Sequence, residues 1–273
     1  MKNRPLGASL GLIVVSLTLA LAARSFAQLK VITSGGFSAA LEELQPQFGN
    51  STGVELAVTR GASQGSGPNT IAAQLRRGVP ADVVIMSREG LDDLIAEGRI
   101  VAGTDENLGQ TPLGLSVRAG APKPDISTVV AFKQAMLDAK SVTFPGSTTG
   151  IYMVEKLFPQ LGVAKEMAAK TTDTGVAAVA RGDAEIAIQP VSELLHVPGT
   201  QFVGALPTEI QYISIFSAAM VKGANDPKGA RQLLNFLVSE TAKASMKNTG
   251  MDPVSPYRIH TGAGRPRSRP EAR

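Results

Sequence analysis

Three short segments rich in glycine, serine and threonine each stand between a predicted strand and a predicted helix. They are residues 34–38 (SGGFS), 61–67 (GASQGSG) and 145–150 (PGSTTG). The free N–H groups of a helix's first turn, its dipole and nearby hydroxyls favour an anion. Serine and threonine also cap helices, so one such loop would be weak evidence. Three in one chain indicate a polar, anionic small-molecule ligand.

Two arginines stand close to these loops. Arg60 directly precedes the second loop, and Arg88 follows the apolar run 83–86. Both lie where strands end, at the sheet edge on which open α/β folds bind ligands. A guanidinium there could hold a carboxylate through two parallel hydrogen bonds. A surface ion pair, for Arg88 with Glu89 or Asp92, is the alternative.

One catalytic pattern competes with ligand binding. Residues 61–65 match G-x-S-x-G, so a serine hydrolase could use Ser63 with His196 and an acid such as Asp173 or Asp183. However, only one other strand precedes the strand that leads into this loop, and no HGGG-type oxyanion segment exists. We therefore expect a binding protein and not an enzyme.

Metal and cofactor sites are not indicated. The chain has no cysteine and two histidines, His196 and His260, so a zinc site with the usual ligands is close to excluded. The glycine-rich loops lack the third glycine of a dinucleotide fingerprint and the lysine of a P-loop. We expect no cofactor.

The termini have their own compositions. Residues 1–27 begin with Lys2 and Arg4, continue with an apolar run and end in Ser25-Phe26-Ala27, as a secretory signal peptide does. Cleavage would leave a soluble periplasmic protein that begins at Gln28, without disulfides or a lipid anchor. Residues 254–273 are predicted to be a disordered basic tail, because they are rich in Pro, Gly and Arg.

The basic balance of the chain comes from these two ends. The net charge is +4, but the signal and the tail hold most of the basic excess, and the rest is slightly acidic. Nucleic acid is therefore not expected as a partner.

Strands and helices alternate along the rest of the chain, as in an α/β protein. The predicted strands are 29–32, 54–58, 83–86, 113–117, 141–144 and 184–188, followed by extended segments at 202–203 and 210–221. The predicted helices are 37–48, 71–77, 91–97, 129–139, 151–161, 176–181 and 230–248.

Several segments resemble the periplasmic molybdate-binding proteins of ABC importers, within the type II solute-binding fold. They are residues 34–41 (SGGFSAAL), 61–63 (GAS), 78–83 (GVPADV), 150–152 (GIY) and 179–184 (VARGDA). The resemblance implies an α/β, two-lobed periplasmic-binding-protein-like fold, in which each lobe is a mostly parallel sheet flanked by helices. Lobe one would comprise 28–112 plus 214–253 and lobe two 113–213, with a hinge near 111–114 and 212–215.

The resemblance also suggests which residues bind the ligand. The family's ligand-binding serines fall on Ser34 and Ser63, and its donors near helix starts fall on Thr149 and Thr172. A tyrosine of the family is replaced by Gln189-Pro190, the second loop is longer, and Arg60 replaces an apolar residue. The complete predicted ligand-binding set is Ser34, Arg60, Ser63, Ser147, Thr148, Thr149, Thr172 and Gln189.

The departures from the family pattern suggest a larger pocket than molybdate needs. The expected function is a monomeric periplasmic solute-binding protein that captures a small anion between its lobes for an ABC permease in the inner membrane. An organic carboxylate is slightly favoured over molybdate or tungstate. The alternatives are the secreted serine hydrolase and a binding protein that serves a sensor instead of a transporter.

Overall fold

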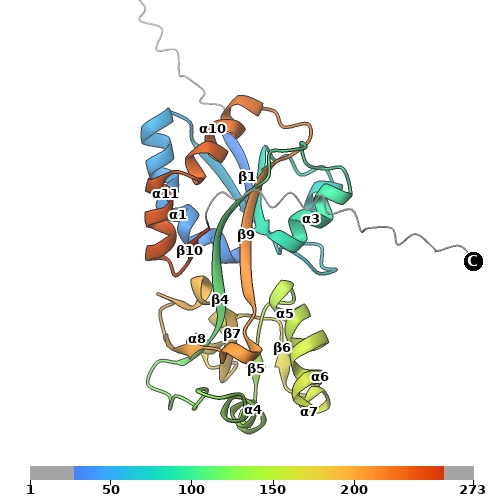
Figure 1. The fold of residues 1–273 in the computed structure, drawn as a ribbon, viewed down its shortest axis with the longest axis vertical. Coiled ribbons are helices and arrows are strands. Elements are labelled where there is room, and N and C mark those ends of the chain that lie inside the picture. Colours follow the sequence, from blue (N-terminus) through green and yellow to red (C-terminus); the bar gives the residue numbers. More distant parts are fainter. Residues whose placement is uncertain (1–27, 255–273) are drawn as a thin grey trace, which may run out of the picture.

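The computed structural model describes residues 28–254. Figure 1 shows two lobes, one above the other, joined by the long strands β4 (Glu106–Arg118) and β9 (Ile213–Met220). The predicted signal peptide, 1–27, and all but the first residue of the predicted tail lie outside the described residues. Within residues 28–254, no helix combines the length and the apolar character that a membrane span needs.

Lobe one, the upper lobe in Figure 1, is built on three parallel strands, β1 (Leu29–Thr33), β2 (Leu56–Arg60) and β3 (Val83–Ser87). The strand order is β2-β1-β3-β9-β4, and the short β10 (Asp252–Pro253) pairs with β4. The helices of this lobe are α1 (Gly35–Thr52), α2 (Ile71–Arg76), α3 (Arg88–Ala96), α10 (Pro227–Leu237) and α11 (Glu240–Asn248).

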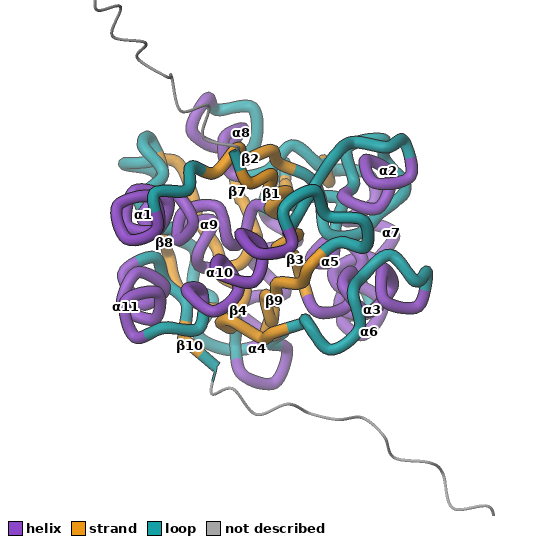
Figure 2. The backbone as a smooth tube through the Cα atoms, turned by 90° about the horizontal axis from the view of Figure 1, so that it is seen from above, coloured by secondary structure: helices purple, strands orange, loops and turns teal. Residues whose placement is uncertain are grey.

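Helices cover both faces of this sheet, as the view from above in Figure 2 shows. Val83 and Ile85 of β3 pack with α1, α10 and α11, whereas Val84 and Met86 pack with α2 and α3. A strand covered on both faces is apolar throughout rather than alternating, which explains why the sequence 83–86 has no polar residue.

Lobe two contains the parallel strands β5 (Val142–Thr143), β6 (Thr171–Thr172) and β7 (Ile186–Pro190), with β8 (Thr200–Ala205) paired to β4. Its helices are α4 (Val129–Asp138), α5 (Thr148–Tyr152), α6 (Phe158–Leu161), α7 (Ala164–Ala168), α8 (Val176–Arg181) and α9 (Val191–Leu194). A π-helical turn (Met153–Leu157) connects α5 to α6, and a 3-10 turn (Thr208–Ile210) precedes β9.

Strand β4 belongs to both lobes. Its first half, up to Pro112, pairs with β9, and from Leu113 onward it pairs with β7 and β8. The sequence predicted only 113–117 as a strand. The first half was not predicted because it includes Asn, Gly, Gln and Pro. Its extended form depends on pairing with β9 rather than on strand propensity.

The last predicted helix, 230–248, is wrong as a single element. The chain forms α10 and α11, and Ser239 between them accepts a hydrogen bond at Oγ from Ala242 N. A serine N-cap of this kind starts a new helix in a different direction. The predicted strand 184–188 also continues further, because Gln189 and Pro190 lie within β7.

Candidate functional site between the lobes

The residues that follow the parallel strands of one lobe contact those of the other lobe. The carboxyl ends of β1, β2 and β3 lie at one edge of lobe one, because these strands are parallel. The same holds for β5, β6 and β7 in lobe two. This is the edge at which open α/β sheets bind ligands. The described structure brings these two edges together at three contacts.

The first contact involves the second glycine-rich loop and the start of α5. Thr148 Oγ1 lies 3.0 Å from Ser87 Oγ and donates to Gln64 Oε1 at 3.0 Å. Gln64 N donates to Ser147 Oγ at 3.2 Å. Gly65 has a φ of +108°, and a Cβ on it would lie 2.6 Å from the carbonyl oxygen of Gly146. Glycine is therefore required where these two loops meet.

The second contact joins the start of α1 to α9. Ser192 Oγ donates to the carbonyl oxygen of Gly36 at 2.8 Å. A Cβ on Gly36 would overlap the ring of Phe216 on β9, so the packing of α1 on that strand requires glycine here. A Cβ on Gly35 would lie 2.9 Å from Oε2 of Glu193, which places that carboxylate against the start of α1.

The third contact lies beside the segment that leads into β9. Tyr212 donates its hydroxyl proton to Oε1 of Glu89, at the start of α3. The Tyr212 ring stacks on that of Tyr152, with centroids 4.9 Å apart and planes 26° apart. Burial and the neighbouring Glu89 raise the pKa of Tyr212 well above its ordinary value, so this phenol stays protonated and remains a donor.

The predicted residues Ser34 and Ser63 are both buried at this junction. Ser34 precedes α1, and its Oγ has no hydrogen-bond partner among the described residues. Ser63 Oγ accepts from Ser87 N at 2.9 Å, which leaves its hydroxyl proton available. Buried polar groups are normally hydrogen-bonded, so the unpartnered hydroxyl of Ser34 indicates a place for a ligand acceptor.

Gln189, which is buried, and Glu193, which is partly buried, form a hydrogen-bonded pair in lobe two. Gln189 Oε1 accepts from Val176 N at 2.5 Å, and its Nε2 donates to Glu193 Oε2 at 2.6 Å. Burial raises the pKa of Glu193 to about 7, although the Gln189 hydrogen bond and the charge of Arg60 act in the opposite direction. The sequence analysis missed Glu193. The only signal was an acid four residues after Gln189, just beyond a strand end.

The other predicted residues lie at varied depths. Arg60, at the end of β2, forms an ion pair with Glu42 of α1 in which both side chains are 65% exposed. Thr149 is buried in the first turn of α5, and Thr172 is exposed at the end of β6. Arg88 forms ion pairs with Asp92 and with Asp105, which is the alternative that the sequence left open for it.

The serine hydrolase is not assembled. Among residues 28–254, no hydrogen bond joins Ser63 to His196; Ser63 Oγ is held by the backbone of Ser87. His196 is exposed, with a φ of +63°, in the turn that follows α9. Asp173 and Asp183 are also exposed. A nucleophile and its base would have to lie within hydrogen-bond reach.

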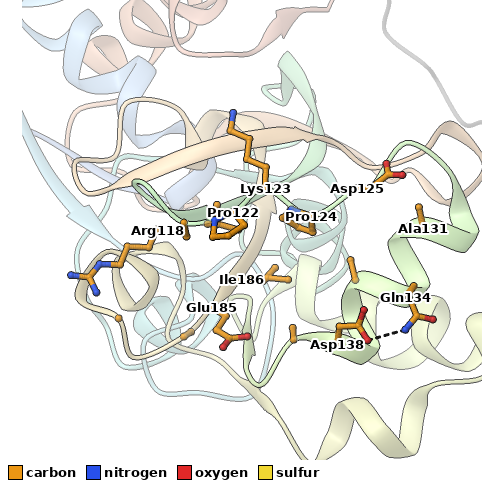
Figure 3. A pocket seen from close by; sticks show the side chains of 16 residues that line it. Arg118, Pro122, Lys123, Pro124, Asp125, Ala131, Gln134, Asp138, Glu185 and Ile186 are labelled. Atoms are coloured by element: carbon orange, nitrogen blue, oxygen red, sulfur yellow. Dashed lines mark hydrogen bonds between the residues drawn. The ribbon is translucent and has the colours of Figure 1, made fainter.

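A separate cavity of about 830 Å³ opens in lobe two, beside α4 (Figure 3). It contains none of the predicted ligand-binding residues. Several of its charged groups already have partners, since Asp138 accepts from Gln134, Glu185 accepts from Lys140 N, and Lys123 donates to Phe202 O. We therefore place the candidate site between the lobes and not in this cavity. Within the part of the chain that the structure describes, no three His, Asp or Glu side chains gather as metal ligands.

Comparison with known proteins decides the family. The bacterial extracellular solute-binding protein family matches residues 29–252. The chain belongs to this family. The predicted resemblance is confirmed, and so is the predicted two-lobed α/β fold. The periplasmic molybdate-binding protein of Azotobacter vinelandii shares the fold, with a TM-score of 0.69 and 20% identity over 84% of this chain and all of that one. The sulfate-binding protein SubI of Mycobacterium tuberculosis gives a TM-score of 0.62 at 19% identity, over 84% of this chain and 88% of that chain.

A relative in sequence corrects one prediction. A Pseudomonas protein named aconitate isomerase is 38% identical over 250 residues, which cover 90% of this chain and 95% of that protein. The prediction that this family member is not an enzyme was therefore wrong. A cleft that binds an anion and a cleft that transforms one use the same donors, so motifs for binding cannot exclude turnover.

Proposed function

We propose that this protein isomerises a tricarboxylate of the aconitate type, bound between its two lobes. The observation that carries this proposal is the 38% identity to an aconitate isomerase over nearly the whole of both chains. The expected preference for an organic carboxylate over molybdate or tungstate points to the same class of ligand.

The groups at the lobe junction suit a ligand with several carboxylates. From lobe one, the free hydroxyl of Ser34, the N–H groups that begin α1 and the hydroxyl of Ser63 would donate to one carboxylate. From lobe two, the first turn of α5 with Thr149 would hold another. Arg60 would leave its exposed partner Glu42 and bind a third carboxylate of the ligand.

Closure of the lobes is part of this proposal. We take the change of β4 partners between Pro112 and Leu113 as the hinge, with Ile213 and Ser214 on the neighbouring strand. A ligand that touches both lobes favours the closed state by its differential affinity for it. Closed lobes exclude water, which strengthens hydrogen bonds to the ligand and protects a reactive carbanion.

A second candidate function is solute delivery to a permease. It is favoured by the family to which the chain belongs and by the fold shared with oxyanion-binding proteins. In both cases we propose export, removal of residues 1–27 and action as a monomer in the periplasm. The two candidates differ in turnover: an isomerase converts many ligand molecules per protein molecule, and a delivery protein binds one.

The test uses purified protein that begins at Gln28, incubated with cis-aconitate and followed by proton NMR. Formation of trans-aconitate over many turnovers supports the isomerase. Thermal stabilisation by aconitate without conversion supports the delivery protein. Stabilisation by molybdate alone overturns the tricarboxylate proposal. A Ser34→Val variant, purified in the same way, controls for contaminating activity, because it should bind aconitate poorly.

A further inference from the structure

We propose that Glu193 is the acid–base group of this reaction: its carboxylate takes a proton from the substrate's methylene carbon and returns a proton to the other end of the same three-carbon unit. This inference rests on the proposed isomerase function. It assigns the movement of a proton to and from carbon to a carboxylate at the lobe junction.

The position of Glu193 is set by contacts across both lobes. It belongs to α9 of lobe two, yet its carboxylate lies against Gly35, the first residue of α1 in lobe one. The preceding residue, Ser192, hydrogen-bonds Gly36 and so ties α9 to the same helix start. Gly35 directly follows Ser34, whose buried hydroxyl has no hydrogen-bond partner within residues 28–254. A substrate carboxylate bound at Ser34 would therefore bring its adjoining methylene carbon into the neighbourhood of Glu193.

One oxygen of Glu193 is held and the other is available. Gln189 donates to Oε2 at 2.6 Å. Among the described residues, no group donates a hydrogen bond to Glu193 Oε1. This oxygen is not fully buried either. The carboxylate is thus oriented by Gln189 and can still take a proton at Oε1. In Glu89, by contrast, Oε1 accepts a hydrogen bond from Tyr212, and Oε2 is buried away from solvent.

The electrostatic surroundings keep both protonation states of Glu193 accessible. Burial raises its pKa to about 7, while Gln189 and the Arg60 guanidinium favour the ionised form. Arg60 is itself paired with Glu42 on α1. A group whose pKa lies near the working pH can act as base in one step and as acid in the next.

The proposed step is balanced. Aconitate carries a methylene group next to its double bond and to a carboxylate, so removal of one methylene proton leaves an allylic carbanion. The C–H bond breaks, its electron pair enters the three-carbon system, and Glu193 Oε1 gains the proton. The O–H bond of protonated Glu193 then breaks as a new C–H bond forms at the far carbon, and the double bond now joins the central carbon to the former methylene carbon. No atom is lost and nothing is oxidised, and the way the terminal carboxylate is held decides between cis and trans.

The test compares the wild type with Glu193→Gln, which keeps the shape of the side chain and an acceptor for Gln189. Glu166→Gln, which replaces an exposed carboxylate on α7, is the matched control. Turnover of cis-aconitate is measured by proton NMR. Binding is measured separately with propane-1,2,3-tricarboxylate, which lacks the double bond and cannot react. We expect a loss of turnover of about 100- to 10,000-fold in Glu193→Gln. Binding of the inert tricarboxylate should be unchanged in both variants.

Two results would overturn the assignment of Glu193. They are turnover by Glu193→Gln at a rate near that of the wild type, and loss of tricarboxylate binding by this variant. Each of these leaves the isomerase function standing, because the wild type would still convert aconitate. A wild type that converts no aconitate would instead overturn the proposed function together with this inference.

Discussion

The side-chain amide of Gln189 connects the end of β7 to the starts of two helices. Its Oε1 accepts a hydrogen bond from Val176 N at 2.5 Å, at the start of α8, and its Nε2 donates to Glu193 Oε2 at 2.6 Å, on α9. Both bonds are partly buried, and together they occupy both polar atoms of the amide. Gln189 therefore positions Glu193, and it stands where the family resemblance places a tyrosine.

Replacing Gln189 with leucine should remove both bonds at once. The N–H of Val176 and the carboxylate of Glu193 would lose their partner, at a cost of about 1–3 kcal/mol in the free energy of unfolding. The pKa of Glu193 should rise further, because the Gln189 hydrogen bond lowers it. Urea denaturation measures the first effect, and a shift of the pH–rate profile to higher pH reports the second. Gln134→Leu, on the exposed face of α4, should change neither.

The raised pKa of Glu193 predicts how stability depends on pH. The folded state holds this proton up to a pH of about 7, whereas the unfolded chain releases it near the ordinary value of 4.5. The native state therefore binds more protons between these values, and its stability falls as the pH rises, by at most about 1.4 kcal/mol per pH unit. Glu193→Gln lacks this charge. It should match the wild type at pH 4 and be more stable at pH 8 in thermal unfolding; equal stability at both values would contradict the buried carboxylate.

Thr148→Val should weaken lobe closure without disturbing the core. The variant loses the hydroxyl contacts to Ser87 and Gln64, which join the two lobes. At about 0.5–1.5 kcal/mol for each bond, affinity for a bound tricarboxylate should fall roughly tenfold. Calorimetric titration gives the affinity, and small-angle X-ray scattering shows whether the liganded variant stays closed. Thr208→Val, at an exposed position, is the control.

Tyr212→Phe separates stacking from hydrogen bonding at the third contact. The ring of Phe would still stack on Tyr152, but Glu89 would lose the donor at Oε1. We expect a loss of about 1–3 kcal/mol in the free energy of unfolding. In a double-mutant cycle with Glu89→Gln, additive losses would show that the two side chains do not interact.

Arg60 and Glu42 give a charge test of the ligand. Arg60→Ala should weaken binding of a tricarboxylate by at least about tenfold, because one carboxylate loses its cation. Glu42→Ala should leave binding unchanged or strengthen it, since an ion pair this exposed contributes little and competes for Arg60. Titration of both variants with propane-1,2,3-tricarboxylate measures these affinities. Equal affinity of Arg60→Ala and the wild type would remove Arg60 from the site.

The sequence alone determined the features that depend on near neighbours in the chain. The apolar run 83–86 predicted a covered strand, and β3 occupies Val83–Ser87. The glycine and serine segments after predicted strands placed Ser34 and Ser63 at strand ends, because a strand, its turn and the next helix start are encoded within about ten residues. The family and the two-lobed α/β class followed from the same local patterns.

The tertiary structure decided what distant segments do to each other. The contact of Ser192 with Gly36 spans 156 residues of sequence, and the burial of Glu193 depends on the lobe across from it. The first half of β4 is a strand because β9 pairs with it, and Tyr212 donates to Glu89 on α3, which lies 123 residues earlier in the chain. In the sequence, a glutamate that becomes desolvated in the folded protein looks the same as one on the surface. The raised pKa of Glu193, on which its proposed acid–base role depends, therefore exists only in the folded chain.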